Sequence, residues 1–518
     1  MNIKLSFLLL LGMFLVFPFL ISCSSVNLAN SYAESYTIEQ THETQLGKKA
    51  QSLMAKSDAN ASGFYPSVDG IESLAIRLAL IEMAEKSIDL QYYLIKDDSV
   101  GKLFVASLVK AAERGVRVRV LLDDIFTKGY DVGMLALDSH PNMEIRLFNP
   151  FAYRNVRTAN LLNGLQLNRR MHNKTFIVDN QFSIVGGRNM AAEYFGARED
   201  LNFSDVDLLV VGPVVSDVST MFDQYWNSKP SVPVSTVVNA KNVDPETRLN
   251  EFRKRIGEEF DKAKKTAYGK ALVSDASALT ERLTDKLIWS TNYQLVYDAP
   301  AKGLRGQAVE AASIVTPLAA ALEESERSLL IVSPYFVPLN SGVEVIESLQ
   351  DRGVDVTVVT NSLASNNHTL VHAGYAPYRK PVLKAGAKIY EAKNDFKLDE
   401  LERLGVGDSS ATLHAKFFVV DEDIIFVGSF NFDPRSVNLN TESGLVVYSK
   451  ALADVALLNL QGSLDANTWE VVLDSRKELQ WIDRSQPEIV TYDKEPNSTW
   501  WRRFKVGFMR MLPIRSQL

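Results

Sequence analysis

The chain has 518 residues, and at roughly 150 residues per domain this length predicts two to four domains, with a two-domain body as the simplest case. Hydrophobic residues make up 46% and charged residues 23% of the chain, a composition typical of globular proteins that argues against disorder or collagen-like structure. The net charge of −7 provides no general basic field for nucleic acid, which counts against a nuclease.

The N-terminus is predicted to be a targeting segment. Residues 5–21 are almost wholly apolar and run into Ser22 and Cys23. This pattern resembles a bacterial lipoprotein signal peptide at 1–22, whose cleavage leaves the Cys23 thiol to carry diacylglycerol. Cys23 is the only cysteine, so no intrachain disulfide can form. The alternative is an uncleaved membrane anchor, because the apolar run is just long enough to span a bilayer.

Both interpretations of the N-terminus place the body outside the cytoplasm, tethered to a membrane. Serine at the position after Cys23 resembles the signal for onward transport, which favours the periplasmic face of the outer membrane over the inner membrane. Residues 23–60 are polar and rich in Ser, Ala and Asn, so we expect them to form a tether between lipid and body.

An internal repeat follows the tether. Residues 115–124 and 353–362 each begin with Gly-Val and predict a strand that follows a helix, and their glycines are 238 positions apart. Residues 85–94 match 326–335 in the same way, at an offset of 241. Alternating strands and amphipathic helices predict an α/β sandwich in each half, at 61–232 and 306–472.

Two segments have no partner in the repeat. Residues 233–305 are predicted to be a helical insertion, with a charged helix at Pro245–Lys265. The tail at 473–518 includes a stretch, 500–515, with five cations, no acidic residue and several aromatic groups, which suits the headgroup boundary of an anionic bilayer. The alternative is a helix docked on the body with its Arg and Lys side chains in solvent.

Each half carries a His-x-Lys motif with matching surroundings. The five shared residue types recur at one offset of 242, in the pairs His172 and His414, Lys174 and Lys416, Asp179 and Asp421, Gly186 and Gly428, and Asn189 and Asn431. One such motif is weak evidence, but five matched positions without a gap are specific. The His and Lys are two residues apart, so on a strand both side chains face one phosphate.

The motif aspartates, Asp179 and Asp421, lie seven positions after each histidine. This odd interval places them on the other face of the strand or in the following turn, so we expect a structural role rather than participation in the chemistry.

These motifs resemble the signature of the phospholipase D superfamily, His-x-Lys-x4-Asp followed by Gly-Gly or Gly-Ser and Asn. The resemblance covers most of the chain after the signal peptide and is closest to bacterial cardiolipin synthases of the third type. It implies two pseudo-twofold-related α/β sandwich domains with the active site at their interface. Longer strings that carry it are Leu147-Phe-Asn-Pro150, Asn168-Arg-Arg-Met-His172, Phe203-Ser-Asp-Val-Asp207, Ser333-Pro-Tyr-Phe-Val-Pro338, Val371-His-Ala-Gly-Tyr375 and Gly428-Ser-Phe-Asn-Phe-Asp-Pro-Arg435.

The expected chemistry is phosphodiester exchange through a phosphohistidine. An unperturbed imidazole titrates near about pH 6.5, so a pair can hold one neutral base and one charged acid. We expect neutral His172 to attack the phosphorus while protonated His414 serves the leaving alcohol, an assignment taken from the resemblance because the repeat is symmetric. Lys174, Lys416, Asn189 and Asn431 are expected to hold the non-bridging oxygens, with no metal or cofactor.

Further residue roles come from the resemblance. In related enzymes a carboxylate about thirty residues after each motif fixes the histidine tautomer, and Asp205 and Glu442 occupy those places, with Asp207 as the alternative to Asp205. His372 is either a hydrogen-bonded core residue or a group that holds the acceptor alcohol. For the aromatic residues that end the first repeat strands, packing is favoured over substrate contact: Tyr92, Tyr93, Tyr335 and Phe336.

The resemblance implies transfer of a phosphatidyl group from a phospholipid to phosphatidylglycerol, giving cardiolipin. The sequence leaves the donor open, and the expected phospholipid substrates are phosphatidylglycerol and phosphatidylethanolamine. Hydrolysis by a phospholipase D, with water as acceptor, is the main alternative. A nuclease is disfavoured by the acidic charge balance and the lipid tether, and an inactive scaffold by the two intact motifs. The expected partners are phospholipids and a membrane surface, without nucleic acid and without a dimer needed for catalysis.

Overall fold

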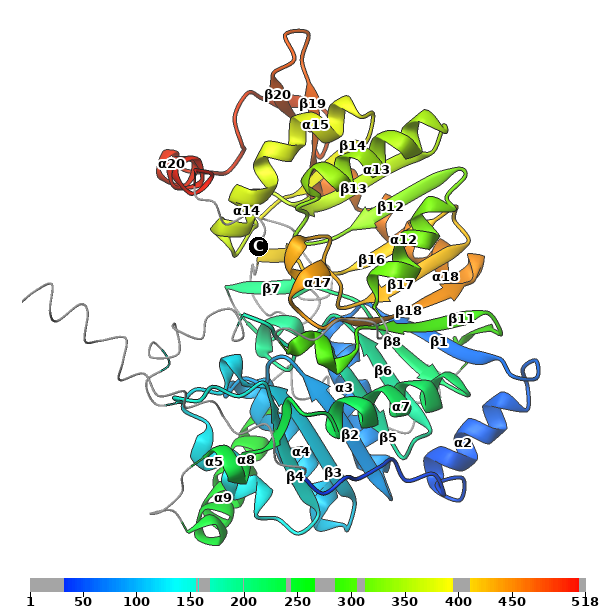
Figure 1. Ribbon diagram of the computed structural model, residues 1–518, viewed down its shortest axis with the longest axis vertical. Helices are drawn as coiled ribbons and strands as arrows, with labels where there is room; N and C mark the ends of the chain where they lie inside the picture. Colours follow the sequence, from blue (N-terminus) through cyan, green and yellow to red (C-terminus); the bar gives the residue numbers. More distant parts are fainter. Residues whose placement is uncertain are drawn as a thin grey trace, which may run out of the picture.

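The computed structural model describes residues 32–154, 157, 168–198, 200–238, 244–265, 285–304, 313–394 and 410–511. The predicted signal peptide, Cys23 and the start of the predicted tether lie outside these residues. The chain forms two halves, each a mixed sheet with helices on both faces, and Figure 1 shows the first half below the second. This arrangement confirms the expectation of two repeated α/β domains.

The first half is built on a nine-stranded sheet with the order β10-β1-β8-β6-β5-β2-β3-β4-β9. Its strands are β1 (Ser62–Ser67), β2 (Ser87–Tyr92), β3 (Arg117–Asp123), β4 (Met143–Phe148), β5 (Thr175–Val178), β6 (Phe182–Gly186), β8 (Asp207–Val211), β9 (Ser231–Pro233) and β10 (Ile288–Ser290). Its helices are α2 (Gln45–Met54), α3 (Gly70–Met83), α4 (Ser99–Glu113), α5 (Asp131–Asp138), α7 (Val214–Trp226), α8 (Val234–Val237) and α9 (Pro245–Lys265).

The second half is built on a ten-stranded sheet with the order β11-β18-β17-β16-β12-β13-β14-β19-β20-β21. Its strands are β11 (Tyr293–Tyr297), β12 (Ser328–Val332), β13 (Asp355–Asn361), β14 (Lys388–Ala392), β16 (Phe417–Val420), β17 (Ile424–Gly428), β18 (Ser443–Tyr448), β19 (Thr468–Leu473), β20 (Leu479–Asp483) and β21 (Val490–Tyr492). Its helices are α12 (Val315–Glu323), α13 (Leu339–Asp351), α14 (Thr369–Tyr375), α15 (Arg379–Lys384), α17 (Pro434–Asn438), α18 (Lys450–Gln461), α19 (Leu464–Asn467) and α20 (Trp500–Met509).

The two sheets share one strand order. The series β8-β6-β5-β2-β3-β4 of the first sheet corresponds to β18-β17-β16-β12-β13-β14 of the second. In both, three parallel strands continue into three antiparallel ones. The parallel strands are covered on both faces by helices, so β2 is buried at every residue of Ser87–Tyr92, including the polar Ser87, Asp89 and Gln91.

One hydrophobic core joins the halves. It contains Leu208 of β8 and Phe222 of α7 from the first half together with Val427 of β17 and Leu452 of α18 from the second. Separate cores fill the outer faces of the two sheets. Because the inner core belongs to both sheets, the halves pack as one body rather than as two domains on a flexible linker.

The described part of the predicted tether differs from expectation. Helix α2 buries Leu46 and Ala50 against the first half. Buried arginines bind the backbone before it: Arg146 Nη2 donates to Ala33 O (2.7 Å) and Arg119 Nη1 to Ser35 O (2.8 Å). Polar residues here are held by hydrogen bonds rather than by an apolar stripe, so the sequence carried no periodic signal.

The segment predicted to be a helical insertion also differs in part. Helix α9 spans the predicted Pro245–Lys265, but β10 pairs with β1 of the first sheet and β11 pairs with β18 of the second. After residue 472, β20 and β21 extend the second sheet before α20 begins. Among the described helices, none combines the length and apolar character needed to cross a bilayer.

Candidate active site

The two His-x-Lys motifs meet at the seam between the halves. Strand β7 (Leu201–Ser204) pairs in parallel with β15 (Ser410–Leu413), so the approach to His414 is paired with the first half. His414 N donates to Ser204 O at 2.7 Å. On the other side of the seam, His172 N donates to Thr441 O at 2.8 Å. Each histidine backbone is therefore held by the opposite half.

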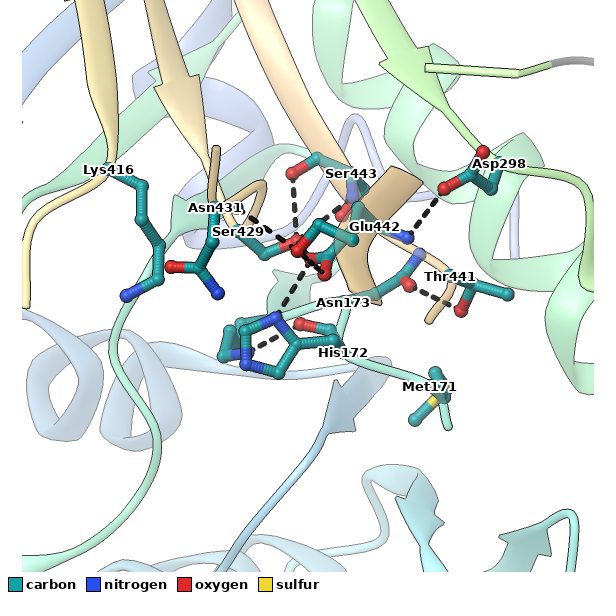
Figure 2. A network of polar contacts seen from close by, with 12 residues as sticks. Met171, His172, Asn173, Asp298, Lys416, Ser429, Asn431, Thr441, Glu442 and Ser443 are labelled. Atoms are coloured by element: carbon teal, nitrogen blue, oxygen red, sulfur yellow. Dashed lines mark hydrogen bonds and ion pairs between the residues drawn. The ribbon is translucent and has the colours of Figure 1, made fainter. Parts of the chain in front are cut away.

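The carboxylates that orient the histidines are crossed in the same way. The Nδ1 atom of His172 lies 2.8 Å from Glu442 Oε2, as Figure 2 shows, and Nδ1 of His414 lies 2.6 Å from Asp205 Oδ2. A carboxylate on Nδ1 favours the tautomer with its proton there, which leaves the Nε2 lone pair for the reacting group. The structure thus brings both predicted carboxylates to a histidine, but to that of the other half.

Asp207, the alternative to Asp205, lies elsewhere in the polar core. Its Oδ2 atom accepts hydrogen bonds from Arg77 Nη2 at 2.8 Å and Arg188 Nη1 at 3.2 Å. Two guanidinium groups hold the pKa of Asp207 below its usual value although burial opposes this. Asp207 therefore fixes the packing beneath the site and does not contact His414 through these bonds.

The lysines of the two motifs are buried beside the histidines. Lys174 Nζ donates to His172 O at 2.5 Å, and Lys416 Nζ lies 2.8 Å from His414 Nδ1. Burial lowers the pKa of Lys416 to about 8 and that of Lys174 well below its usual value, and in Lys174 the charge of Lys416 adds to the effect. Two lysine amines in one buried seam form a site for an anion, whose charge would favour their protonated forms.

The histidine pKa values differ from the expectation of one charged ring. Burial, followed by the charges of Lys174 and Lys416, lowers the pKa of His172 well below 6.5. Burial and the Lys416 charge lower the pKa of His414 to about 3 although Asp205 opposes them. At neutral pH both rings are neutral, because a third positive charge is unfavourable beside two lysines. A phosphodiester anion beside the lysines would offset their charge and raise both pKa values.

The motif asparagines are buried at the same seam. Asn189 Nδ2 donates to Tyr194 Oη at 2.9 Å. The Oδ1 atoms of Asn189 and Asn431 have no hydrogen-bond partner among the described residues. Figure 2 shows Asn431 and Lys416 extending beside the His172 ring. Buried amides of this kind are suited to bind a polar ligand.

The motif aspartates bind backbone at the far ends of strands β5 and β16. The Asp179 carboxylate accepts the N–H groups of residues 85–87 at 2.7 to 3.0 Å, and Asp421 accepts those of residues 326–328 at 2.7 to 2.9 Å. Both aspartates have positive φ, 49° and 53°, as in a tight hairpin turn. Each therefore joins its hairpin to the start of the neighbouring parallel strand.

Aromatic rings enclose both imidazoles. Tyr93 contacts His172 edge-on, with ring centroids 5.0 Å apart. Tyr194 and Phe203 contact His414 at 5.0 and 5.1 Å. Tyr194 was not predicted as a site residue, and Phe203 stood only within a longer string. Nothing in their local pattern marks them as neighbours of His414, which lies 220 positions after Tyr194.

The other three aromatic residues at the strand ends lie further from the rings. Tyr92 and Phe336 are buried in the hydrophobic cores, and Tyr92 Oη accepts a hydrogen bond from Arg77. Tyr335 Oη donates to Asn367 Oδ1 at 2.8 Å. Packing was favoured for all four residues, and of the four Tyr93 packs on the His172 ring.

Glu442 has supporting partners that the sequence did not reveal. Ser429 Oγ donates to its Oε2 at 2.5 Å and Ser436 Oγ to its Oε1 at 2.8 Å. The residue matching Ser429 in the first half is Gly187, where a Cβ atom would lie 2.2 Å from Asp205 Oδ1. The Gly-Gly and Gly-Ser variants of the motif therefore reflect two ways of accommodating a carboxylate.

His372 lies on α14 in a separate buried network. Its Nε2 atom is 3.1 Å from Glu495 Oε1 and 3.0 Å from Arg379 Nη2. Its Nδ1 atom has no partner among the described residues, and burial lowers the pKa of the ring. These contacts fit the interpretation as a core histidine, and none of them joins it to His172 or His414.

Comparison with known proteins agrees with this geometry. The family model described as "Cardiolipin synthase, PLD-like domain" matches residues 78–226 and 318–460. Cardiolipin synthase C of Escherichia coli (strain K12) is 39% identical over 87% of this chain and 95% of its own. The major cardiolipin synthase ClsA of Bacillus subtilis (strain 168) is 25% identical over 86% of this chain and 73% of its own.

A solved structure shares the fold. The crystal structure of phosphatidylserine synthase from Haemophilus influenzae Rd KW20 matches with a TM-score of 0.56 and 13% identity, over 91% of this chain and 99% of that chain. Both halves of the present chain, with their crossed His-x-Lys seam, match one family model over more than half of the sequence. The chain therefore belongs to the cardiolipin synthase family with phospholipase D-like domains.

Proposed function

We propose that the protein transfers a phosphatidyl group between two phospholipids and forms cardiolipin, through a phosphohistidine at His172. The observation that carries the proposal is the crossed pair of histidine–carboxylate contacts, 2.8 Å for His172 with Glu442 and 2.6 Å for His414 with Asp205. Two oriented imidazoles beside two buried lysines provide a nucleophile, an acid–base group and an anion site. The relatives named as cardiolipin synthases supply the substrate class.

The reaction has two mirrored steps. A phosphodiester bound beside the lysines offsets their charge, so His414 takes up a proton from solvent. Neutral His172 then attacks the phosphorus through Nε2, the P–O bond to the first alcohol breaks, and His414 gives that oxygen its proton. The hydroxyl of the acceptor phosphatidylglycerol then gives its proton to His414, and its oxygen attacks the phosphorus. The P–N bond breaks and His172 is regenerated. Lys174 and Lys416 stabilise the negative oxygens of the five-coordinate species.

Product analysis tests the reaction. Purified protein is incubated with vesicles of phosphatidylglycerol, with and without phosphatidylethanolamine, and the lipids are measured by mass spectrometry. Cardiolipin with release of the donor alcohol is expected. Phosphatidic acid without cardiolipin would favour hydrolysis and overturn the transfer proposal.

Trapping tests the order of the histidines. His414→Ala should accumulate a phosphatidyl adduct. Attack by His172 still occurs slowly, while the general base that activates the acceptor hydroxyl is lost. His172→Ala should accumulate none. The reverse pattern, read from modified peptides, assigns the nucleophile to His414 instead.

We also propose that α20 contacts an anionic membrane. Its buried side is small: Val506 packs with Leu363 and Ala373, and Arg502 Nη2 donates to Asn366 O at 2.6 Å. The other side exposes large apolar groups, with Trp500 67%, Phe504 51% and Phe508 57% accessible. Cations and no carboxylate lie on this helix, a combination that favours the headgroup region of an anionic bilayer.

Sedimentation with vesicles tests this contact. Replacing Trp500, Trp501, Phe504 and Phe508 by Ala in protein lacking residues 1–23 should weaken binding to phosphatidylglycerol vesicles more than tenfold, since each ring buries substantial apolar area. The control is the exchange to Ala of exposed apolar groups elsewhere, Tyr36, Leu458 and Ile489. Equal loss in both variants would contradict a specific role for α20.

For the N-terminus we propose lipidation at Cys23 and residence on the periplasmic face of the outer membrane. The support is the sequence pattern of residues 5–25. Cys23→Ser should block signal cleavage and incorporation of labelled fatty acid in cells. Unchanged mobility and labelling in Cys23→Ser would contradict the proposal, and membrane fractionation distinguishes outer from inner membrane.

A further inference from the structure

An apolar cavity of about 460 Å³ lies in the first half, between the sheet and helices α4, α5 and α9. This volume falls within the ~300–1,000 Å³ that is usual for sites of small ligands. Side chains from each surrounding element form its walls, including Val105 and Leu108 of α4, Val120 and Leu122 of β3, Leu137 of α5 and Phe252 of α9.

One end of the cavity reaches the active site. Tyr93 belongs to its lining, and the same ring contacts His172 edge-on with centroids 5.0 Å apart. Lys174 Nζ lies 5.5 Å from the centre of that ring. Asp123, also in the lining, accepts a hydrogen bond from Met171 N at 2.8 Å, so it holds the backbone next to His172. A single aromatic ring thus separates the cavity from the histidine.

The chemistry of the walls selects the kind of occupant. Val, Leu, Ile and Met side chains supply most of the interior, and they offer no hydrogen bond to a polar ligand. The charged groups of the lining have both signs and lie beside the apolar interior: Lys102 pairs with Asp97 and Arg248 pairs with Glu251. Apolar walls whose charged groups pair with one another fit an elongated apolar group, and the anion site beside it is the one formed by Lys174 and Lys416.

We propose that this cavity holds an acyl chain of the phospholipid whose phosphorus is attacked at His172. The inference rests on the proposed function for the identity of the substrate. In a phospholipid the phosphate and the acyl esters share one glycerol unit, so a phosphorus beside His172 places the start of an acyl chain near Tyr93. Burial of the chain then supplies binding energy at a distance from the reacting bond.

Gly133 of α5 offers a direct test. It belongs to the lining, and a Cβ atom added there would meet no heavy atom within 4 Å, so a larger side chain has space to occupy without a backbone clash. Gly133→Phe should lower kcat/KM for dioleoyl phosphatidylglycerol about tenfold or more, while dihexanoyl phosphatidylglycerol changes less than about twofold. A graded loss through Ala, Leu and Phe is expected because filling increases in that order.

Two further variants control this result. Gly257→Phe adds the same ring to α9 at a position that is equally open and outside the lining, and it should not discriminate between the two lipids. Val105→Phe fills the cavity from α4 and should reproduce the discrimination even if Gly133→Phe folds poorly. Equal loss for both chain lengths, or no loss in either filled variant, overturns the proposal.

A labelling experiment separates this inference from the proposed function. Phosphatidylglycerol with a photoreactive diazirine on an acyl chain is irradiated with full-length protein carrying His172→Ala, where no turnover is needed. The label should map to peptides of 99–113 and 131–138, and Gly133→Phe should reduce it at least about fivefold. Wild-type protein that makes no lipid product but labels these peptides contradicts the function alone. Normal turnover with label elsewhere contradicts the cavity alone.

Discussion

The two halves have the same strands around the histidines. They differ in the segment that connects the second parallel strand of each sheet to the third. In the first half the connection from β3 to β4 forms α5, and an apolar cavity remains beneath it. In the second half the connection from β13 to β14 forms α14 and α15, and charged side chains fill the interior. There Arg379 Nε donates to Glu391 Oε1 at 2.6 Å, and Tyr375 Oη donates to the same oxygen at 2.9 Å.

This difference shows that the two copies of the repeat share one part and differ in another. The strands that carry His, Lys and Asn keep one geometry, since both copies must serve one phosphorus atom. The connecting segments have no such requirement. One of them leaves room for an apolar group, and the other forms a cross-linked polar core on which α20 docks. The four predictions below test this division, from the largest expected effect to the smallest.

The largest effect is expected from removing a carboxylate that contacts the histidine of the other half. Asp205→Asn should lower kcat by about 10³- to 10⁴-fold, because the amide no longer fixes the His414 tautomer. It should also lower the pKa of His414 further, since Asp205 now raises it, and leave His172 unchanged. Histidine NMR titrations measure both rings. A shift at His172 instead would show that each carboxylate serves its own half.

Disrupting the polar core of the second half should lower the free energy of unfolding. Glu391→Leu removes the acceptor for Arg379, Tyr375 and Trp481 Nε1, and should lower the free energy of unfolding by about 3 kcal/mol. In the first half, Gly133→Ala should raise it by up to about 1 kcal/mol, because alanine favours a helix. Urea unfolding compares the two, and effects of the same sign would remove the contrast.

The Gly-Gly and Gly-Ser positions should respond unequally. Gly187→Ala forces the Asp205 carboxylate to move, since the new Cβ would lie 2.2 Å from Oδ1, and a loss of about 100-fold in kcat is expected. Ser429→Ala removes one hydrogen bond to Glu442, which Ser436 still contacts, so about tenfold is expected. Single-turnover kinetics on both variants test the order, and a larger effect of Ser429→Ala would reverse it.

Acid should destabilise the protein through the buried histidines. The folded pKa of His414, about 3, lies below its unfolded value of 6.5, so the unfolded chain binds the extra proton first. Stability is therefore complete above pH 6.5 and is lost as pH falls toward 3, by up to about 1.4 kcal/mol per pH unit. His414→Gln should flatten this slope while the exposed His42→Gln should not. Equal slopes in both variants would contradict the assignment.

Much of the fold was predictable from the sequence, and so were the His and Lys residues that meet between the two halves. The repeat at one offset identified both halves, and the two-residue spacing of His and Lys placed their side chains on one strand face. The crossing of Asp205 and Glu442 was not predictable, because it depends on β7 pairing with β15, whose first residue Ser410 lies 209 positions after its partner Leu201. Chain order pairs each carboxylate with its own motif, and only three-dimensional packing reverses that.

The remaining differences from the sequence-based expectations have two physical causes. Residues 33–37 bind the first half through backbone oxygens to arginines, and such contacts leave no apolar period in the sequence. The lowered histidine pKa values arise from burial and from lysines of both halves. Model-compound values therefore suggested a charged ring that the folded seam disfavours.

The short strands β10 and β11 have a mechanical consequence. They follow each other along the chain, separated only by Thr291 and Asn292, yet β10 forms an edge of one sheet and β11 an edge of the other. Separating the halves would remove a strand from at least one sheet, so a hinge motion that opens the two halves is strongly resisted. Exchange of substrate and product would then depend on side-chain rotation rather than on domain motion.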